Sequence, residues 1–157
     1  MYLERQIEDN LDADLREEYE VAVVIPAYNE ENAISKQIDN VKAVMDKTGL
    51  SYTLIVVDDG STDNTAGEAD RHDIKLIRLP RNSGYGAALK AGFAAANSEY
   101  IIIIDADGTY PADAIPSMMQ KVPEYDMVVG ARIGQNTNIP FVRKPAKWFL
   151  QKLASYL

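Results

Sequence analysis

From residue 21 onward, short apolar runs alternate with segments that place apolar residues at helical spacing. The runs VAVVIP (21–26), TLIVVD (53–58) and YIIIID (100–105) are apolar without alternation, which is typical of strands covered on both faces. Between the first two runs, Ile34, Ile38, Val41 and Met45 recur three or four residues apart and Gly49 follows, which predicts a helix over 30–47. The remaining expected elements are strands at 74–79 and 127–131, helices at 84–97 and 111–122, and a short helix ending near residue 72.

This order of strands and helices, joined by short loops, predicts an α/β fold with a doubly wound, mostly parallel sheet and helices on both faces. We expect one core domain over 21–132, an acidic extension over 1–20 and a basic amphipathic segment over 133–157. In open parallel sheets, ligands bind outside the carboxyl ends of the strands. The loops that follow the strands are therefore the candidate site.

Composition supports a folded domain and narrows the function. The chain has 157 residues, of which 46% are hydrophobic and 25% charged, which excludes a mainly disordered or collagen-like protein. It contains no cysteine, so disulfides, thiolate metal sites and cysteine nucleophiles are excluded. The formal charge of -8 argues against a nucleic-acid binder. The acidic start resembles neither a secretory signal nor a transit peptide, so a cytoplasmic setting is expected.

Charge is distributed unevenly along the chain. Residues 1–20 carry eight acids and two bases, whereas residues 131–157 carry five bases and no acid. The basic end is either a solvated helix face or a surface that meets an anion, such as a phosphate or a lipid head group. Residues 146–157 form a broad apolar face that the sequence does not cap. We therefore interpret 133–157 as the truncated start of an acceptor-binding or membrane-facing region.

Two carboxylates, Asp105 and Asp107, flank Ala106 directly after the isoleucine run. Carboxylates at i and i+2 on the turn that leaves a strand can approach one hard cation, and Mg²⁺ or Mn²⁺ prefers such oxygen ligands. The alternative is that the acids cap the following helix or face water.

The loop after the second strand reads Asp58-Asp59-Gly60-Ser61, with Asp63 and Thr65 beyond it. An acid at the end of a strand can accept from a ribose hydroxyl or a base N–H. For Ser61, Asp63 and Thr65 we expect helix capping instead.

Two further features suit a phosphate group. Gly84-Tyr85-Gly86 opens the Ala-rich helix, where free amides favour anions, although close packing of helix and sheet explains the glycines equally well. Arg132 follows the last expected strand, and its guanidinium suits a diphosphate or pairs with a nearby acid.

Taken together, these motifs resemble the family 2 inverting glycosyltransferases of the GT-A (Rossmann-like) fold, in the family's order over about 21–132. The matching pieces are IPAYNE (25–30), VDDGS (57–61) with Asp63 and Thr65, NSGYGAA (82–88) and DAD (105–107) with Pro111. Within the family, the segment from 130 to 149 resembles the dolichyl- and polyprenyl-phosphate sugar synthases.

The resemblance implies a nucleotide-sugar donor of the GDP-mannose or UDP-glucose type and a Mg²⁺ or Mn²⁺ ion. Asp105 and Asp107 would hold the metal, and these two with Arg132 form the expected catalytic set. Thr109 stands where the synthases often have a glutamine ligand, so its hydroxyl is the expected third metal ligand, with a water in that position as the alternative. The donor-binding residues implied are Pro26, Tyr28, Glu30, Val57, Asp59, Gly84 and Ala106.

The implied reaction is displacement at the anomeric carbon by a polyprenyl or dolichyl phosphate. Such a phosphate has a second pKa of about 6, so it is ionised at neutral pH and needs little general-base help. The protein is then expected to lie at the cytoplasmic face of a membrane, without a nucleic-acid partner. The sequence leaves homo-oligomerisation open.

Two alternatives remain at this point. The first is a nucleotide-sugar-binding module without transfer activity. The second is a haloacid-dehalogenase-type phosphatase, because IIIIDADGT (101–109) also resembles the nucleophile motif of that family.

Overall fold

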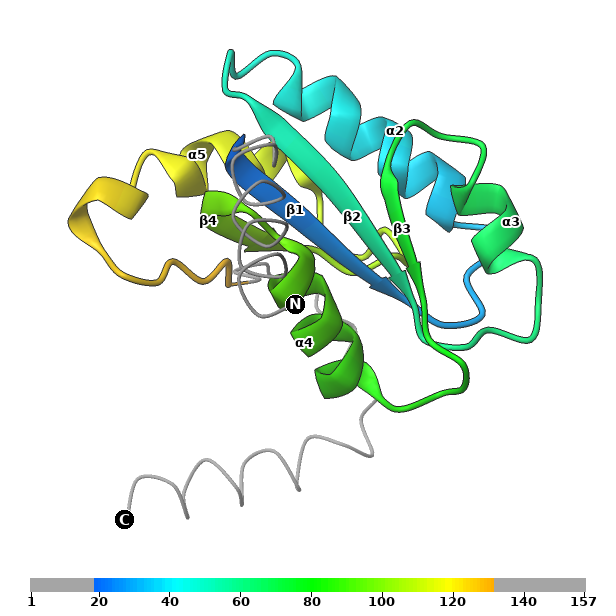
Figure 1. Cartoon of the computed structure of the whole chain (residues 1–157). Coiled ribbons are helices and arrows are strands. Elements are labelled where there is room, and N and C mark those ends of the chain that lie inside the picture. Colours follow the sequence, from blue (N-terminus) through cyan, green and yellow to red (C-terminus); the bar gives the residue numbers. More distant parts are fainter. Residues whose placement is uncertain (1–18, 132–157) are drawn as a thin grey trace, which may run out of the picture.

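The computed structural model describes residues 19–131, in which four parallel strands form one sheet in the order β3-β2-β1-β4 (Figure 1). The predicted parallel α/β architecture is confirmed. The strands are β1 (Tyr19–Ala27), β2 (Tyr52–Asp58), β3 (Lys75–Arg78) and β4 (Ser98–Ile103). The longer helices are α2 (Ile34–Met45) and α4 (Tyr85–Ala95), and α3 (Thr65–Ala69) is a short helix before β3.

Helices cover the two faces of the sheet, and each face has its own core (Figure 1). On one face, Val23 and Ile25 of β1 pack with Ile38 of α2 in a fully buried cluster. On the other face, Val24 and Val57 pack beneath α4. A Cβ on Gly92 of α4 would lie only 3.3 Å from Cγ2 of Val57, so a small residue is needed there for the helix to approach the sheet.

The segment after β4 differs from the prediction. Instead of one helix over 111–122, the chain forms a 3₁₀ turn η1 (Ala112–Ala114), helix α5 (Ile115–Met119) and a second 3₁₀ turn η2 (Val122–Glu124). Pro116 and Pro123 lie in the first turns of α5 and η2. Since proline lacks the N–H that a helix interior requires, it is found at such starts and interrupts longer helices.

Two strand predictions are wrong. Residues 127–131 form no strand, and Met127 and Val129 are 78% and 72% exposed, so the described part of the chain offers their apolar side chains no partner surface. The isoleucine run was expected to be buried on both faces, but Ile101 and Ile103 of β4 are 43% and 45% exposed. Helix α4 packs on β1 and β2, and no helix within residues 19–131 covers that face of β4 to the same extent.

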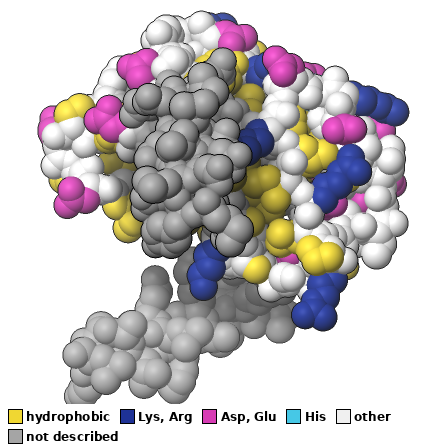
Figure 2. Space-filling view, viewed as in Figure 1, with side chains coloured by type: hydrophobic (Ala, Val, Ile, Leu, Met, Phe, Trp, Pro, Cys, Tyr) yellow, Lys and Arg dark blue, Asp and Glu magenta, His cyan; other side chains and the backbone are white. Residues whose placement is uncertain are grey.

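Acidic and basic side chains are interspersed over the face shown in Figure 2, with hydrophobic side chains between them. Among the described residues in this view, the basic side chains lie in separate places.

The strand order fixes where a ligand can bind. From β1 the chain moves outward through β2 to β3, and then returns to place β4 on the other side of β1. Such a reversal opens a crevice at the carboxyl ends of the two strands that flank it. In this chain those strands are β1 and β4.

Candidate functional site

A cavity of about 460 Å³ opens at this crevice. Its walls come from the loops that follow all four strands. The lining residues are Pro26, Ala27, Tyr28, Glu30, Asp59, Asn82, Gly84, Tyr85, Ala88, Asp105, Ala106 and Asp107.

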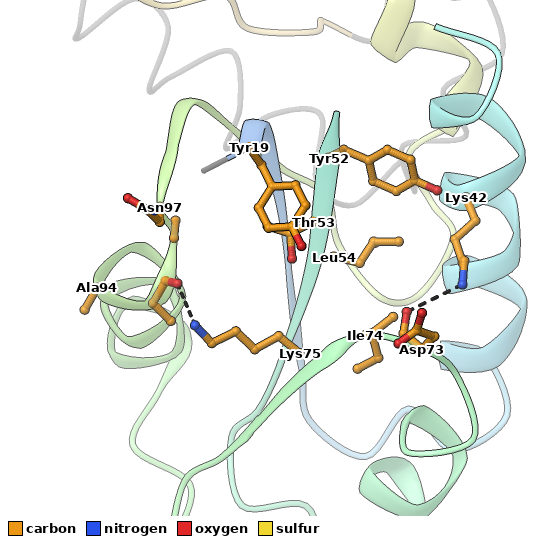
Figure 3. A pocket seen from close by; sticks show the side chains of 12 residues that line it. Tyr19, Lys42, Tyr52, Thr53, Leu54, Asp73, Ile74, Lys75, Ala94 and Asn97 are labelled. Carbon is orange, nitrogen blue, oxygen red and sulfur yellow. Dashed lines mark hydrogen bonds between the residues drawn. The ribbon is translucent and has the colours of Figure 1, made fainter. Parts of the chain in front are cut away.

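A larger cavity of about 770 Å³ lies at the opposite, amino end of the strands (Figure 3). Its two lysines already bond to the backbone: Nζ of Lys75 donates to the Ala95 carbonyl at 2.8 Å, and Nζ of Lys42 to the Asp73 carbonyl at 3.5 Å. None of the predicted site residues lines this cavity. The carboxyl-end cavity is therefore the candidate site.

The loops after β1 and β2 are joined by hydrogen bonds. The hydroxyl of the buried Thr65 accepts from the Glu30 amide at 2.7 Å, and Oδ2 of Asp63 accepts from the Glu31 amide at 3.1 Å. Asn29, held at a φ of 57°, accepts from the Thr62 amide at 2.9 Å. These bonds fix the loop that carries Tyr28 and Glu30 into the cavity.

Of the three residues expected to cap α3, Asp63 does so: its Oδ1 accepts from the amide of Thr65, the first residue of the helix, at 2.9 Å. The residue directly before α3 is Asn64, whose own side chain makes no capping bond. Ser61 instead accepts from the Asn29 amide at 2.9 Å. The motif therefore holds the neighbouring loop, a partner that residue spacing alone does not reveal.

Asp59 is almost fully buried and joins the loops after β2 and β3. Its Oδ1 accepts from the Ser83 amide and its Oδ2 from the Gly84 amide, both at 2.8 Å. Beside it, Gly60 has a φ of +68°, and a Cβ there would lie 2.6 Å from Cα of Arg81. The backbones of the two loops thus approach as closely as glycine allows.

The two aspartates after β4 have different partners. The hydroxyl of Tyr85 donates to Oδ1 of Asp105 at 3.1 Å. The amide of Thr109 donates to Oδ1 of Asp107 at 2.8 Å, and the Thr109 hydroxyl bonds the same oxygen. The hydroxyl of Thr109 therefore orients Asp107 in this structure, and its expected role as a metal ligand stays a prediction.

Negative charge accumulates in the cavity. Partial burial raises the pKa of Glu30, and the carboxylates of Asp107 and Asp63 raise it further. Partial burial and the neighbouring Asp105 carboxylate also raise the pKa of Tyr85. A cation at this edge of the sheet would relieve the repulsion among these groups.

The cavity brings together most of the predicted site residues. Val57 and Thr109 are the exceptions among those described: the side chain of Val57 is fully buried under α4, and Thr109 does not line the cavity. Arg132 lies outside the described residues. Sequence reasoning did not identify Tyr85, Asn82 and Ala88 as lining residues, although they fall within the glycine motif it singled out. The predicted residues that line the cavity are Pro26, Tyr28, Glu30, Asp59, Gly84, Asp105, Ala106 and Asp107.

The donor set fits a hard cation only in part. Within residues 19–131, no group of three or more His, Cys, Asp or Glu side chains could hold a metal ion by itself. Mg²⁺ and Mn²⁺ sites commonly use one or two carboxylates and complete their coordination with water and substrate phosphates. Asp105 and Asp107 match that pattern.

The same described part of the chain contains no helix long and apolar enough to cross a bilayer.

Comparison with known proteins finds a family model and solved structures that this chain resembles. The model of the family described as glycosyl transferase family 2 matches residues 22–156. Glucosyl-3-phosphoglycerate synthase from Mycobacterium tuberculosis, solved with Mn²⁺, UDP and phosphoglyceric acid, is 30% identical with a TM-score of 0.57. That match covers 66% of this chain and 39% of the synthase chain. The same synthase has been solved with Mg²⁺ and UDP.

A second solved structure, described as a mycobacterial protein, is 29% identical with a TM-score of 0.59. The match covers 70% of this chain and 39% of that one. The chain thus spans about two fifths of the length of the solved proteins it matches.

Proposed function

Because the chain belongs to glycosyl transferase family 2, we propose that its carboxyl-end cavity binds the nucleoside diphosphate of a nucleotide sugar and supports transfer of the sugar. The phosphatase alternative is discarded, since the matched family is a glycosyltransferase family. The observation that carries the proposal is the convergence of Asp59, Asp105 and Asp107 on one cavity at the switch point of the sheet.

The donor would span the cavity from the loops after β1 and β2 to the loop after β4. Tyr28 and Asp59 suit the nucleoside, since one offers an exposed ring and the other carboxylate acceptors. Asp105 and Asp107 suit a Mg²⁺ or Mn²⁺ ion that carries the diphosphate. When bound, the ion supplies charge stabilisation for the leaving diphosphate. The synthase structures that contain UDP favour a uridine nucleotide over a guanosine one.

For the acceptor we propose a polyprenyl or dolichyl phosphate. Its phosphate oxygen would attack the anomeric carbon as the bond from that carbon to the diphosphate breaks, with inversion. Support comes from the composition of segment 131–157, which is basic, acid-free and rich in apolar residues over 146–157, as suits a lipid phosphate at a membrane surface. On this proposal the protein is peripheral to the cytoplasmic face of a membrane.

A small phosphorylated acid is the second candidate acceptor. The specific observation in its favour is the phosphoglyceric acid bound in the matched synthase structure. Both acceptors carry a phosphate monoester, but only the polyprenyl or dolichyl phosphate has a lipid tail.

Two assays test these proposals. A thermal-shift panel of UDP-, GDP- and dTDP-sugars with Mn²⁺ should show stabilisation by one nucleotide class and little by the others. Sugar transfer should then be assayed with polyprenyl phosphate and with 3-phosphoglycerate as acceptors. Stabilisation without transfer to either acceptor would leave the chain as a donor-binding module, and no stabilisation by any nucleotide sugar would contradict the proposed site.

A further inference from the structure

Tyr85 lines the cavity together with Asp59, which follows β2, and Asp105, which follows β4. It is the first residue of α4 and 55% exposed, and its hydroxyl donates to Oδ1 of Asp105. No other hydrogen bond to the Asp105 carboxylate is made within residues 19–131. This hydrogen bond from Tyr85 favours one orientation of the Asp105 carboxylate.

The residue before Tyr85 is held by Asp59, which we assign to the nucleoside. Gly84, with a φ of +92°, turns the chain into α4, and its amide is bonded to Asp59. Asp59 in turn lies directly after β2. A continuous set of contacts therefore runs from Asp59 through Gly84 and Tyr85 to Asp105.

We propose that Tyr85 is a positioning residue for the cation site: by holding Oδ1 of Asp105, it presents the other carboxylate oxygen to the metal. This inference rests on the proposed function, because it requires a metal at Asp105. Partners that orient metal ligands typically change metal affinity by about 10–100-fold when they are removed. Tyr85→Phe keeps the ring in the cavity and removes only the hydroxyl that bonds Asp105, so metal-free nucleotide binding should stay unchanged.

The test measures the affinity of the full chain for Mn²⁺ in the presence of UDP. Binding is monitored as the loss of the electron paramagnetic resonance signal of free Mn²⁺. Tyr85→Phe deletes only the hydroxyl. The matched control is Tyr125→Phe, because Tyr125 is 59% exposed and does not line the cavity. We expect Mn²⁺ to bind at least about tenfold more weakly to Tyr85→Phe than to wild type, and equally well to the control. UDP affinity in EDTA and the melting temperature should match wild type.

Asp105→Asn separates failure of this inference from failure of the proposed function. If Asp105→Asn loses Mn²⁺ but Tyr85→Phe binds it as wild type does, the positioning role is wrong and the metal site stands. If Tyr85→Phe also weakens UDP binding in EDTA, Tyr85 contacts the nucleotide directly and the inference is overturned. If wild type with UDP binds no Mn²⁺, the proposed metal site and the role of Tyr85 fall together.

Discussion

Oδ2 of Asp59 lies 2.8 Å from the backbone nitrogen of Gly84, so a side chain at the end of β2 fixes the first turn of α4. Its other oxygen holds the Ser83 amide at the same distance. The carboxylate that the sequence assigned to the nucleoside therefore also builds the wall of the cavity.

Asp59→Asn should destabilise the protein by about 1–3 kcal/mol, because the new amide group would face a backbone N–H that it cannot accept from. Chemical denaturation measures this change. Asp126→Asn is the control, since Asp126 is exposed and does not line the cavity. Equal stability of Asp59→Asn and wild type would show that these hydrogen bonds do not hold the loop.

Gly60 and Gly49 form a matched pair for testing the close approach of the two loops. Both have positive φ, but a Cβ at Gly49 would meet nothing within 4 Å, whereas one at Gly60 would lie 2.7 Å from the backbone nitrogen of Asn82. Gly49→Ala should cost about 1–2 kcal/mol for its backbone conformation alone. Gly60→Ala should cost about 1–3 kcal/mol more, through overpacking. Similar unfolding free energies for the two variants would contradict the packing described.

The sequence was sufficient to predict the parallel sheet, which local patterns indicate, and the cavity, which follows from the topology of such a sheet. Apolar runs mark the strands, and the polar residues that follow them meet at one edge by topology. The contacts of Thr65 and Asp63 were not predictable, because they reach a loop more than thirty residues away. The expected strand at 127–131 was wrong because an apolar run forms a strand only where a partner strand is available.

Gln37 is buried in α2, and its Nε2 finds no hydrogen-bond partner within the described structure. A buried donor without a partner costs about 1–3 kcal/mol. Gln37→Met keeps a similar unbranched shape and removes that donor, so we expect the unfolding free energy to rise by about 1 kcal/mol. Chemical denaturation checks this. A loss of stability would mean that Nε2 is satisfied, for example by a buried water.

Asp63 makes the stability depend on pH. Burial acts to raise its pKa, but hydrogen bonds from Thr65 and from the amide of Glu31 outweigh it, so the net pKa lies below the usual aspartate value of 3.8. A group whose pKa is lowered by folding stabilises the protein above its unfolded pKa, and this contribution is lost as the pH falls through the folded value. Wild type should therefore exceed Asp63→Asn in stability at pH 6, and by less at pH 3. Chemical denaturation at pH 6 and pH 3 measures the difference in unfolding free energy between wild type and Asp63→Asn. A difference that grows as the pH falls would contradict a lowered pKa of Asp63.

The most direct test of the proposed site is a calorimetric titration of UDP into wild type and Asp107→Ala, each with Mn²⁺ and with EDTA. We expect Mn²⁺ to tighten UDP binding to wild type and to have no such effect on Asp107→Ala, while the two proteins bind UDP alike in EDTA. If Asp107→Ala shows the same Mn²⁺ dependence as wild type, the cation does not bind at the carboxylates after β4 and the central claim is wrong.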